Sequence, residues 1–195
     1  MVRAVLAARG GRPAGEIDAR VAASAVHLGL VARLVSPALA AAALGQHLDL
    51  SLDGLWWQAE LGGPVPLSVP APVSGTRPVP GDWHHELLAG VIAPLTIATS
   101  RAVPVSDRVL RGNVASAINA AAGQVAAARP GLASPAWAAA RALFASPWLA
   151  REPGPPGPGF RRASCCLFYR LAPDARSARA DRCGDCVLRA APAPR

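Results

Sequence analysis

Residues 151–159, with the sequence REPGPPGPG, divide the chain into two unequal parts. Proline lacks the backbone N–H that helices and central strands use, and glycine adds conformational freedom, so neither element can continue through this run. Closely spaced prolines instead favour a stiff, extended conformation. We therefore predict a body at residues 1–150, a linker at 151–159, a C-terminal segment at 160–189 and a short tail at 190–195.

The body has the composition of packed helices. Hydrophobic residues make up 52% of the chain but aromatic residues only 5%, and most of the apolar residues are Ala, Leu and Val. Helices favour Ala and Leu, whereas strands favour aromatic and β-branched side chains. We predict a mainly α fold with a small antiparallel β element (α+β), on which the C-terminal segment docks.

Apolar spacing and capping signals place the individual elements. Helices are expected at residues 16–35, 36–44, 82–100 (bent near Pro94), 106–129 and 134–144. Alternating side chains at residues 48–61 and 64–69 predict two short strands, with a turn at 62–64. Within the first strand, we expect Trp56 and Trp57 to pack against a helix.

The most apolar stretch, residues 21–45, is interrupted by His27, Arg33 and Pro37. Charged and helix-breaking residues are unusual in a membrane span, so we interpret this stretch as core helices. The apolar run between Arg3 and Arg9 is too short for the core of a signal peptide. The sequence therefore predicts a cytoplasmic protein with no membrane span.

The chain is basic, and its positive charge is concentrated near the C-terminus. Its formal net charge is +8, and residues 151–195 contain nine Arg but only four acidic residues. Such a surface attracts acidic partners. Few aromatic residues accompany the arginines and no nucleic-acid motif is present, so we expect no nucleic-acid partner.

All four cysteines lie in the C-terminal segment: Cys165, Cys166, Cys183 and Cys186. In a reducing compartment, such a group is more typical of a metal site than of disulfides. A C-x-x-C turn directs two sulfurs at one metal, but adjacent cysteines form a poor chelate for zinc. An iron–sulfur cluster, which spreads its ligands over two irons, is favoured by this pattern. Structural zinc, a disulfide or free thiols remain alternatives.

The stretch FRRASCCLFYRL followed by CGDCVL resembles the C-terminal signature of the FhuF-type ferric siderophore reductases. Upstream, RVLRGNVASAINAAAGQ is similar to the long helix of that family, with Gly112, Asn113 and Ser116 in its core. The segment ARLVSPALAAAALG, followed by Leu-Trp-Trp, also fits the N-terminal half of the family.

This resemblance implies a [2Fe–2S] cluster held by Cys165, Cys166, Cys183 and Cys186. It further implies one-electron reduction of a ferric siderophore, which releases iron as Fe(II). The alternatives are an iron–sulfur electron carrier or sensor that does not act on siderophores, and a zinc-stabilised basic binding module. The sequence contains no nicotinamide or flavin motif, so the electron must come from a protein or another external reductant.

The arginines near the cysteines suggest where a partner docks. We expect Arg161, Arg162 and Arg170 to bind an acidic donor protein of the ferredoxin or flavodoxin type, or the substrate.

Sixteen residues separate Cys166 from Cys183, against about ten in the family, and the extra residues are predicted to form a surface loop. We expect Asn113 to be a buried polar or helix-contact residue, and the histidines to be structural.

Overall fold

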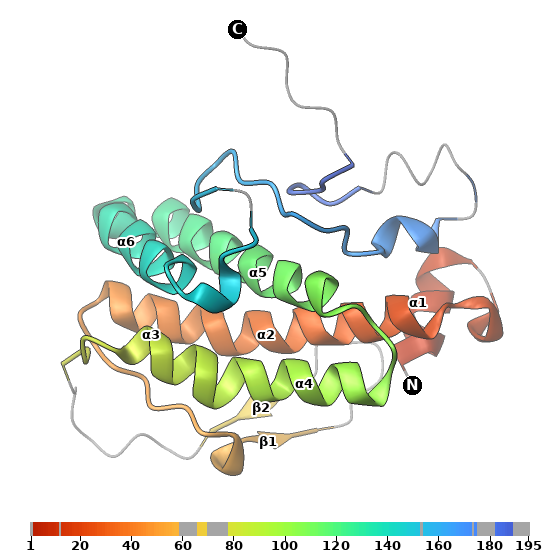
Figure 1. The fold of residues 1–195 in the computed structure, drawn as a ribbon, viewed down its shortest axis with the longest axis horizontal. Coiled ribbons are helices and arrows are strands. Elements are labelled where there is room, and N and C mark those ends of the chain that lie inside the picture. The colour runs from red at the N-terminus through yellow and green to blue at the C-terminus, as the bar shows by residue number, and fades with distance from the viewer. Residues whose placement is uncertain are drawn as a thin grey trace, which may run out of the picture.

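The structure is a computed structural model, and it describes residues 2–11, 13–58, 66–69, 78–152, 154–172, 174 and 182–188. Two parallel helices, α2 (Ala19–Ala43) and α5 (Asp107–Ala128), pack along each other at its centre (Figure 1). α6 (Ala133–Phe144) lies beside both, and a helical segment ending in α4 (Ala93–Ala102) lies against α2. The C-terminal segment crosses α5 on the side opposite the β-hairpin. The predicted mainly α fold with a small β element is confirmed.

α2 is one continuous helix, so the predicted break at Ser36 and Pro37 is wrong. Apolar side chains on both sides of this point, including Val35 and Leu39, are buried in the core. Pro37 is exposed. The burial of apolar side chains on both sides of Pro37 stabilises the helix enough to offset the roughly 3 kcal/mol that a proline inside a helix costs. Asp18 caps the start of the helix, and its carboxylate accepts a hydrogen bond from the Arg20 backbone N–H (2.9 Å).

The helical segment at residues 83–102 combines α3 (Trp83–His85), a π-helical stretch (Glu86–Ile92) and α4. It confirms the helix predicted at residues 82–100. Only Ala93 separates Pro94 from the π-helical stretch, and proline cannot donate to the carbonyl four residues earlier. A wider turn before a proline is one way to accommodate that missing donor.

α5 and α6 confirm the predicted helices at residues 106–129 and 134–144 to within one or two residues. A short turn of 3₁₀ helix, η4 (Pro130–Leu132), joins them. Their small Ala-rich faces allow close approach, and Ala122 and Ala140 are both completely buried. Together with α2 and residues 83–92 they enclose one apolar core.

The predicted hairpin is present as β1 (Trp56–Trp57) and β2 (Leu67–Ser68), which pair antiparallel. A 3₁₀ turn, η2 (Leu52–Gly54), precedes it. The two tryptophans do not pack on a helix as predicted, because 73% of Trp56 and 64% of Trp57 is exposed. Leu55 and Leu67 make the contacts with the core instead. The predicted turn at residues 62–64 lies outside the described residues.

The N-terminus forms a helix that the sequence analysis did not predict. α1 (Val2–Gly10) and a 3₁₀ turn, η1 (Ala14–Glu16), precede α2. Among the described helices, α2 is long and apolar enough to cross a membrane by length and composition. Its Ser24 and His27 are nevertheless buried against protein, as in the core helix of a bundle.

The described residues 147–152 and 154–160 run along the bundle rather than away from it. A 3₁₀ turn, η5 (Pro147–Leu149), follows α6. The Gly157 N–H then donates to Asn119 Oδ1 on α5 (2.8 Å). The Phe160 ring meets the Phe144 ring edge to face, with 5.4 Å between centroids. These contacts carry the chain back to α5 just before the cysteines, and the proposed domain limits remain predictions.

Candidate metal centre

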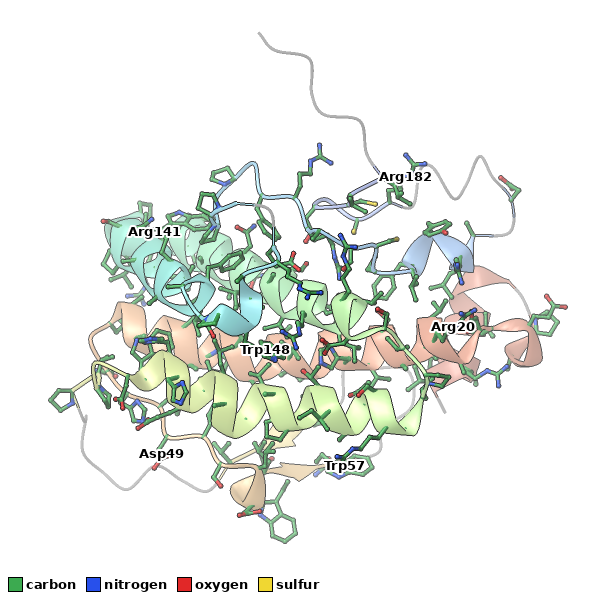
Figure 2. All side chains as sticks on the ribbon, viewed as in Figure 1. Arg20, Asp49, Trp57, Arg141, Trp148 and Arg182 are labelled. Carbon is green, nitrogen blue, oxygen red and sulfur yellow. The ribbon has the colours of Figure 1, made fainter. Side chains whose placement is uncertain are left out.

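Two short segments, residues 160–171 and 182–188, bring the cysteines together. The Arg162 N–H donates to the Asp185 carbonyl (3.1 Å), and Arg161 Nη1 donates to the Cys186 carbonyl (3.1 Å). These bonds place Cys166 Sγ 3.5 Å from Cys183 Sγ. Figure 2 shows the sulfur atoms gathered close to Arg182.

The backbone turns sharply after the adjacent cysteines. Leu167 has φ +71°, a left-handed conformation that is uncommon for a residue other than glycine. Its N–H donates to Cys165 Sγ (3.3 Å), and in the same way the Leu188 N–H donates to Cys186 Sγ (3.4 Å). A short 3₁₀ helix, η6 (Phe168–Leu171), follows. The left-handed backbone at Leu167 costs on the order of 1–3 kcal/mol. The turn that it makes allows the adjacent Cys165 and Cys166 to belong to one site.

The thiols differ in how readily they lose a proton. Burial raises the pKa of Cys165, and the nearby Cys166 and Cys186 add to the rise. The hydrogen bond with Cys183 lowers the pKa of Cys166 to about 6, and it raises the pKa of Cys183. Cys166 is therefore the thiol of this pair that first reaches the thiolate form, which is the form that binds metal.

The four thiols fit an iron–sulfur cluster. All are free, and Cys166 and Cys186 are buried. Two sulfurs on one tetrahedral metal, with bonds of about 2.3 Å, lie about 3.8 Å apart, close to the distance from Cys166 to Cys183. Within the part of the chain that the structure describes, no three His, Cys, Asp or Glu side chains are grouped to hold a single ion. The close Cys166–Cys183 pair joins one cysteine of the adjacent pair to one of the C-x-x-C turn, as a cluster shared by both motifs requires.

A buried polar network joins this site to the bundle, and it consists of Ser24, Asn113 and Arg162. Arg162 Nη2 donates to Asn113 Oδ1 (2.6 Å), and Asn113 Nδ2 donates to the Ser24 carbonyl (3.0 Å). Ser24 Oγ then donates to the Cys166 carbonyl (2.9 Å). The network links α2, α5 and the cysteine segment, and it confirms the prediction that Asn113 is a buried polar residue.

Gly112, on α5, makes this close approach sterically feasible. A Cβ atom at this position would lie 2.4 Å from Ser164 Oγ and 2.9 Å from Arg162 Nη2. Ser164 Oγ itself donates to the Arg108 carbonyl (2.8 Å). The glycine therefore lets the segment before the cysteines lie directly on the helix.

Arg162 does not have the docking role predicted for it. Only 1% of the residue is exposed, because it lies between α5 and the cysteine segment. Its guanidinium donates to Asn113 Oδ1 and to the Val109 carbonyl (3.2 Å), which are both neutral acceptors. A buried charge is costly without an opposite charge. The same guanidinium lowers the pKa of Cys166, so negative sulfur is a natural counter-charge for it.

His27 lies beside this network as a structural residue. Thr96 Oγ1 donates to the Ile92 carbonyl (2.7 Å), so the His27 Nε2–H donates to Thr96 Oγ1 (3.0 Å). His27 Nδ1 has no hydrogen-bond partner among the described residues. Burial, followed by the charge of Arg162, lowers the pKa of His27 to about 4. The ring is neutral at pH 7.

The other two predicted docking arginines lie at the edge of the site. Arg161 is half-buried, and Arg170 is exposed with Nη1 3.4 Å from Asp18 Oδ2.

The sequence analysis missed the connection of Ser24 and Arg162 to the site. The sequence signal that could have revealed this connection is Asn113, a polar residue next to Gly112 inside an apolar helix. Residues 175–181 of the predicted surface loop lie outside the described residues.

Comparison with known proteins agrees with this geometry. Residues 162–188, which include all four cysteines and Arg162, match the family described as the FhuF 2Fe-2S C-terminal domain. No curated protein matches the chain. No solved structure matches it either. The match identifies a [2Fe–2S] cluster as the cofactor. The chain is therefore an iron–sulfur protein, and its residues 162–188 are similar to the FhuF 2Fe-2S C-terminal domain.

Proposed function

We propose that this protein reduces ferric siderophores by one electron and so releases their iron as Fe(II). One observation carries the proposal. The cysteines of a FhuF 2Fe-2S domain come together on a helical body, with Cys166 Sγ 3.5 Å from Cys183 Sγ. Siderophores bind hard Fe(III) through oxygen far more tightly than Fe(II). One electron is therefore sufficient for release, and no acid or base residue is required.

In this proposal the four cysteines, Cys165, Cys166, Cys183 and Cys186, are the ligands of the cluster. When bound, the cluster supplies one electron at a time. The protein holds it through Ser24 and Asn113, which fix the segment that carries Cys166. Buried Arg162 offsets part of the negative charge of the thiolates. Replacing Cys166 or Cys183 with Ser should abolish the visible absorption and leave the helical circular dichroism in place.

The electron donor is proposed to be an acidic protein of the ferredoxin or flavodoxin type. Arg161 and Arg170 lie near the cysteines, and Val187 and Leu188 expose apolar surface directly after Cys186. Attraction between basic and acidic surfaces mainly speeds association and weakens with salt. We place the protein in the cytoplasm, where thiols stay reduced.

The function is tested with protein purified without oxygen and reduced by dithionite. After the excess dithionite is removed, a ferric siderophore is added while the visible spectrum and an Fe(II)-specific chelator are followed. We expect the oxidised spectrum to return with one Fe(II) trapped per cluster. The gallium(III) form of the same siderophore, which cannot be reduced in this way, is the control. A cluster that remains reduced with every ferric siderophore would instead indicate an electron carrier or a sensor.

A further inference from the structure

A cavity of about 460 Å³ lies between the start of α5 and the turn η5. Its lining includes Arg108 and Arg111 from α5, Trp148 from η5, and Arg151 and Glu152 from the chain that follows. In Figure 2, Trp148 lies near the middle of the view, on the turn η5 that contacts α5. The proposed reaction assigns no role to this cavity.

The lining is cationic and partly rigid. Arg111 is held by Asp107 Oδ2 (2.6 Å) and by the Trp148 carbonyl (2.8 Å), and its guanidinium lies 5.0 Å from the centre of the Trp148 ring. Arg108 and Arg151 are exposed. With Arg111 they provide three guanidinium groups, against the two carboxylates of Asp107 and Glu152. Guanidinium groups bind carboxylate and similar paired oxygen anions through two hydrogen bonds, and an aromatic ring beside them can cover a flat ligand.

The wall of this cavity is also attached to the cysteine segment. Arg108 Nη2 donates to the Ala163 carbonyl (3.4 Å), and Glu152 Oε2 accepts from the Ala163 N–H (3.0 Å). Ala163 precedes Cys165 by two residues, which span at most about 7 Å of chain. A ligand in the cavity would therefore lie close to the cysteines.

A second cavity, of about 500 Å³, does not fit the same purpose. It is lined by residues of α2, the loop after it and the segment at residues 83–90, including Asp49 and Glu86. These carboxylates repel anions. Asp49 and Arg182, which marks the cysteine site, lie at opposite sides of the molecule in Figure 2.

We propose that the arginine-lined cavity binds the ferric chelate, and that it selects chelates with net negative charge, such as tris-catecholate or carboxylate complexes, over neutral trihydroxamates. This proposal rests on the proposed function, because it names the substrate class and the place of that reaction. The selectivity comes from Arg108 and Arg151, whose charges are not neutralised by an ion pair with Asp107 as that of Arg111 is.

Binding is measured with gallium(III) complexes, which separate binding from reduction, by calorimetry on the holoprotein. We expect a gallium tris-catecholate to bind at least tenfold more tightly than a gallium trihydroxamate. Arg151→Glu and Arg108→Glu should each weaken tris-catecholate binding about tenfold, equivalent to ~1.4 kcal/mol. Arg129→Glu is the matched control, because this exposed arginine follows the other end of α5, roughly 33 Å away.

The outcomes separate this proposal from the proposed function. If Arg151→Glu and Arg129→Glu bind the tris-catecholate as tightly as the unmodified protein, the cavity is not the site, even where ferric chelates are reduced. Equal binding of both complexes would likewise overturn the claimed selectivity. If the gallium complex binds with the expected dependence on Arg151 but no ferric complex is reduced, the site stands and the reductase function fails.

Discussion

The interface between α2 and α5 is polar at one end and apolar at the other. Near the starts of the two helices, Ser24 and Asn113 bond to each other and to the cysteine segment. Farther along, side chains such as Val31, Val35 and Ile118 form part of one apolar core. Both ends are buried, so exposure does not explain the difference.

The difference reflects two separate tasks. The apolar end stabilises the bundle by removing hydrocarbon from water. Buried polar groups add little net stability even when they are fully paired, and they cost free energy when one partner is removed. At the polar end they attach a segment with little regular structure to rigid helices, and they hold the positive charge of Arg162 beneath the cysteines.

The largest expected effect on stability is at the apolar end. Ile118→Ala should lower the free energy of unfolding by about 2–5 kcal/mol, because it leaves a cavity in a completely buried position. In the protein that remains folded, the visible spectrum of the cluster should not change. Urea unfolding followed by circular dichroism measures the loss of stability. Loss of iron from the folded variant would show that the two ends are not separate.

At the polar end, His27 should make stability depend on pH. Its pKa in the folded protein is about 4, below the value of about 6.5 for an unperturbed histidine. The unfolded chain therefore binds the extra proton first, and stability should fall by about 3 kcal/mol as the pH drops from 6.5 to 4. His27→Gln should remove most of this slope in urea unfolding. A slope that is the same in both proteins would refute the burial of a neutral ring.

Asn113→Ala should cost about 1–3 kcal/mol, because it removes a buried hydrogen-bond partner from the Arg162 guanidinium and from the Ser24 carbonyl. Unlike Ile118→Ala, it should also reduce the iron bound per chain. Asn119→Ala is the matched control on the same helix, since among the described residues it removes the bond to Gly157 and none to the cysteine segment. Equal iron contents in the two variants would contradict a special role for Asn113.

Two glycines of α5 provide the smallest and sharpest comparison. A Cβ at Gly123 would meet only Trp137, at 3.9 Å, so Gly123→Ala should stabilise the helix by up to about 1 kcal/mol. Gly112→Ala should instead destabilise the protein and loosen the cluster, because its Cβ would collide with Ser164 and Arg162. Thermal unfolding and iron content check both variants. A stabilised Gly112→Ala protein with full iron content would rule out the close approach.

Much of the fold could be predicted from the sequence, because helices and turns leave patterns within short stretches of chain. These patterns are the spacing of apolar residues and the positions of Pro and Gly. They located α5, α6 and the hairpin. The break expected at Pro37 failed because burial on both sides outweighed a local signal. The packing expected of Trp56 failed for a related reason, since a residue type does not reveal which face of a short strand meets the core.

At the candidate site, the sequence identified the cysteines but not what lies beneath them. The spacing of cysteines is a local pattern, whereas the burial of Arg162 depends on α5 lying under residues 162–164. The neighbouring Arg161 and Arg170 keep more of their surface exposed. Three arginines that looked equivalent in the sequence therefore have different environments in the fold.

The central claim is that Arg162 supplies a buried positive charge to the cluster, and the reduction potential of the cluster tests it most directly. Reduction adds negative charge, so a nearby buried cation favours the reduced form. Arg162→Gln keeps a donor for Asn113 but removes the charge, whereas Arg162→Lys keeps the charge. We expect the Gln variant to have a potential lower by on the order of 60 mV, a tenfold change for one electron, and the Lys variant to stay near the unmodified protein. An unchanged potential in an Arg162→Gln protein with full iron content would contradict the claim.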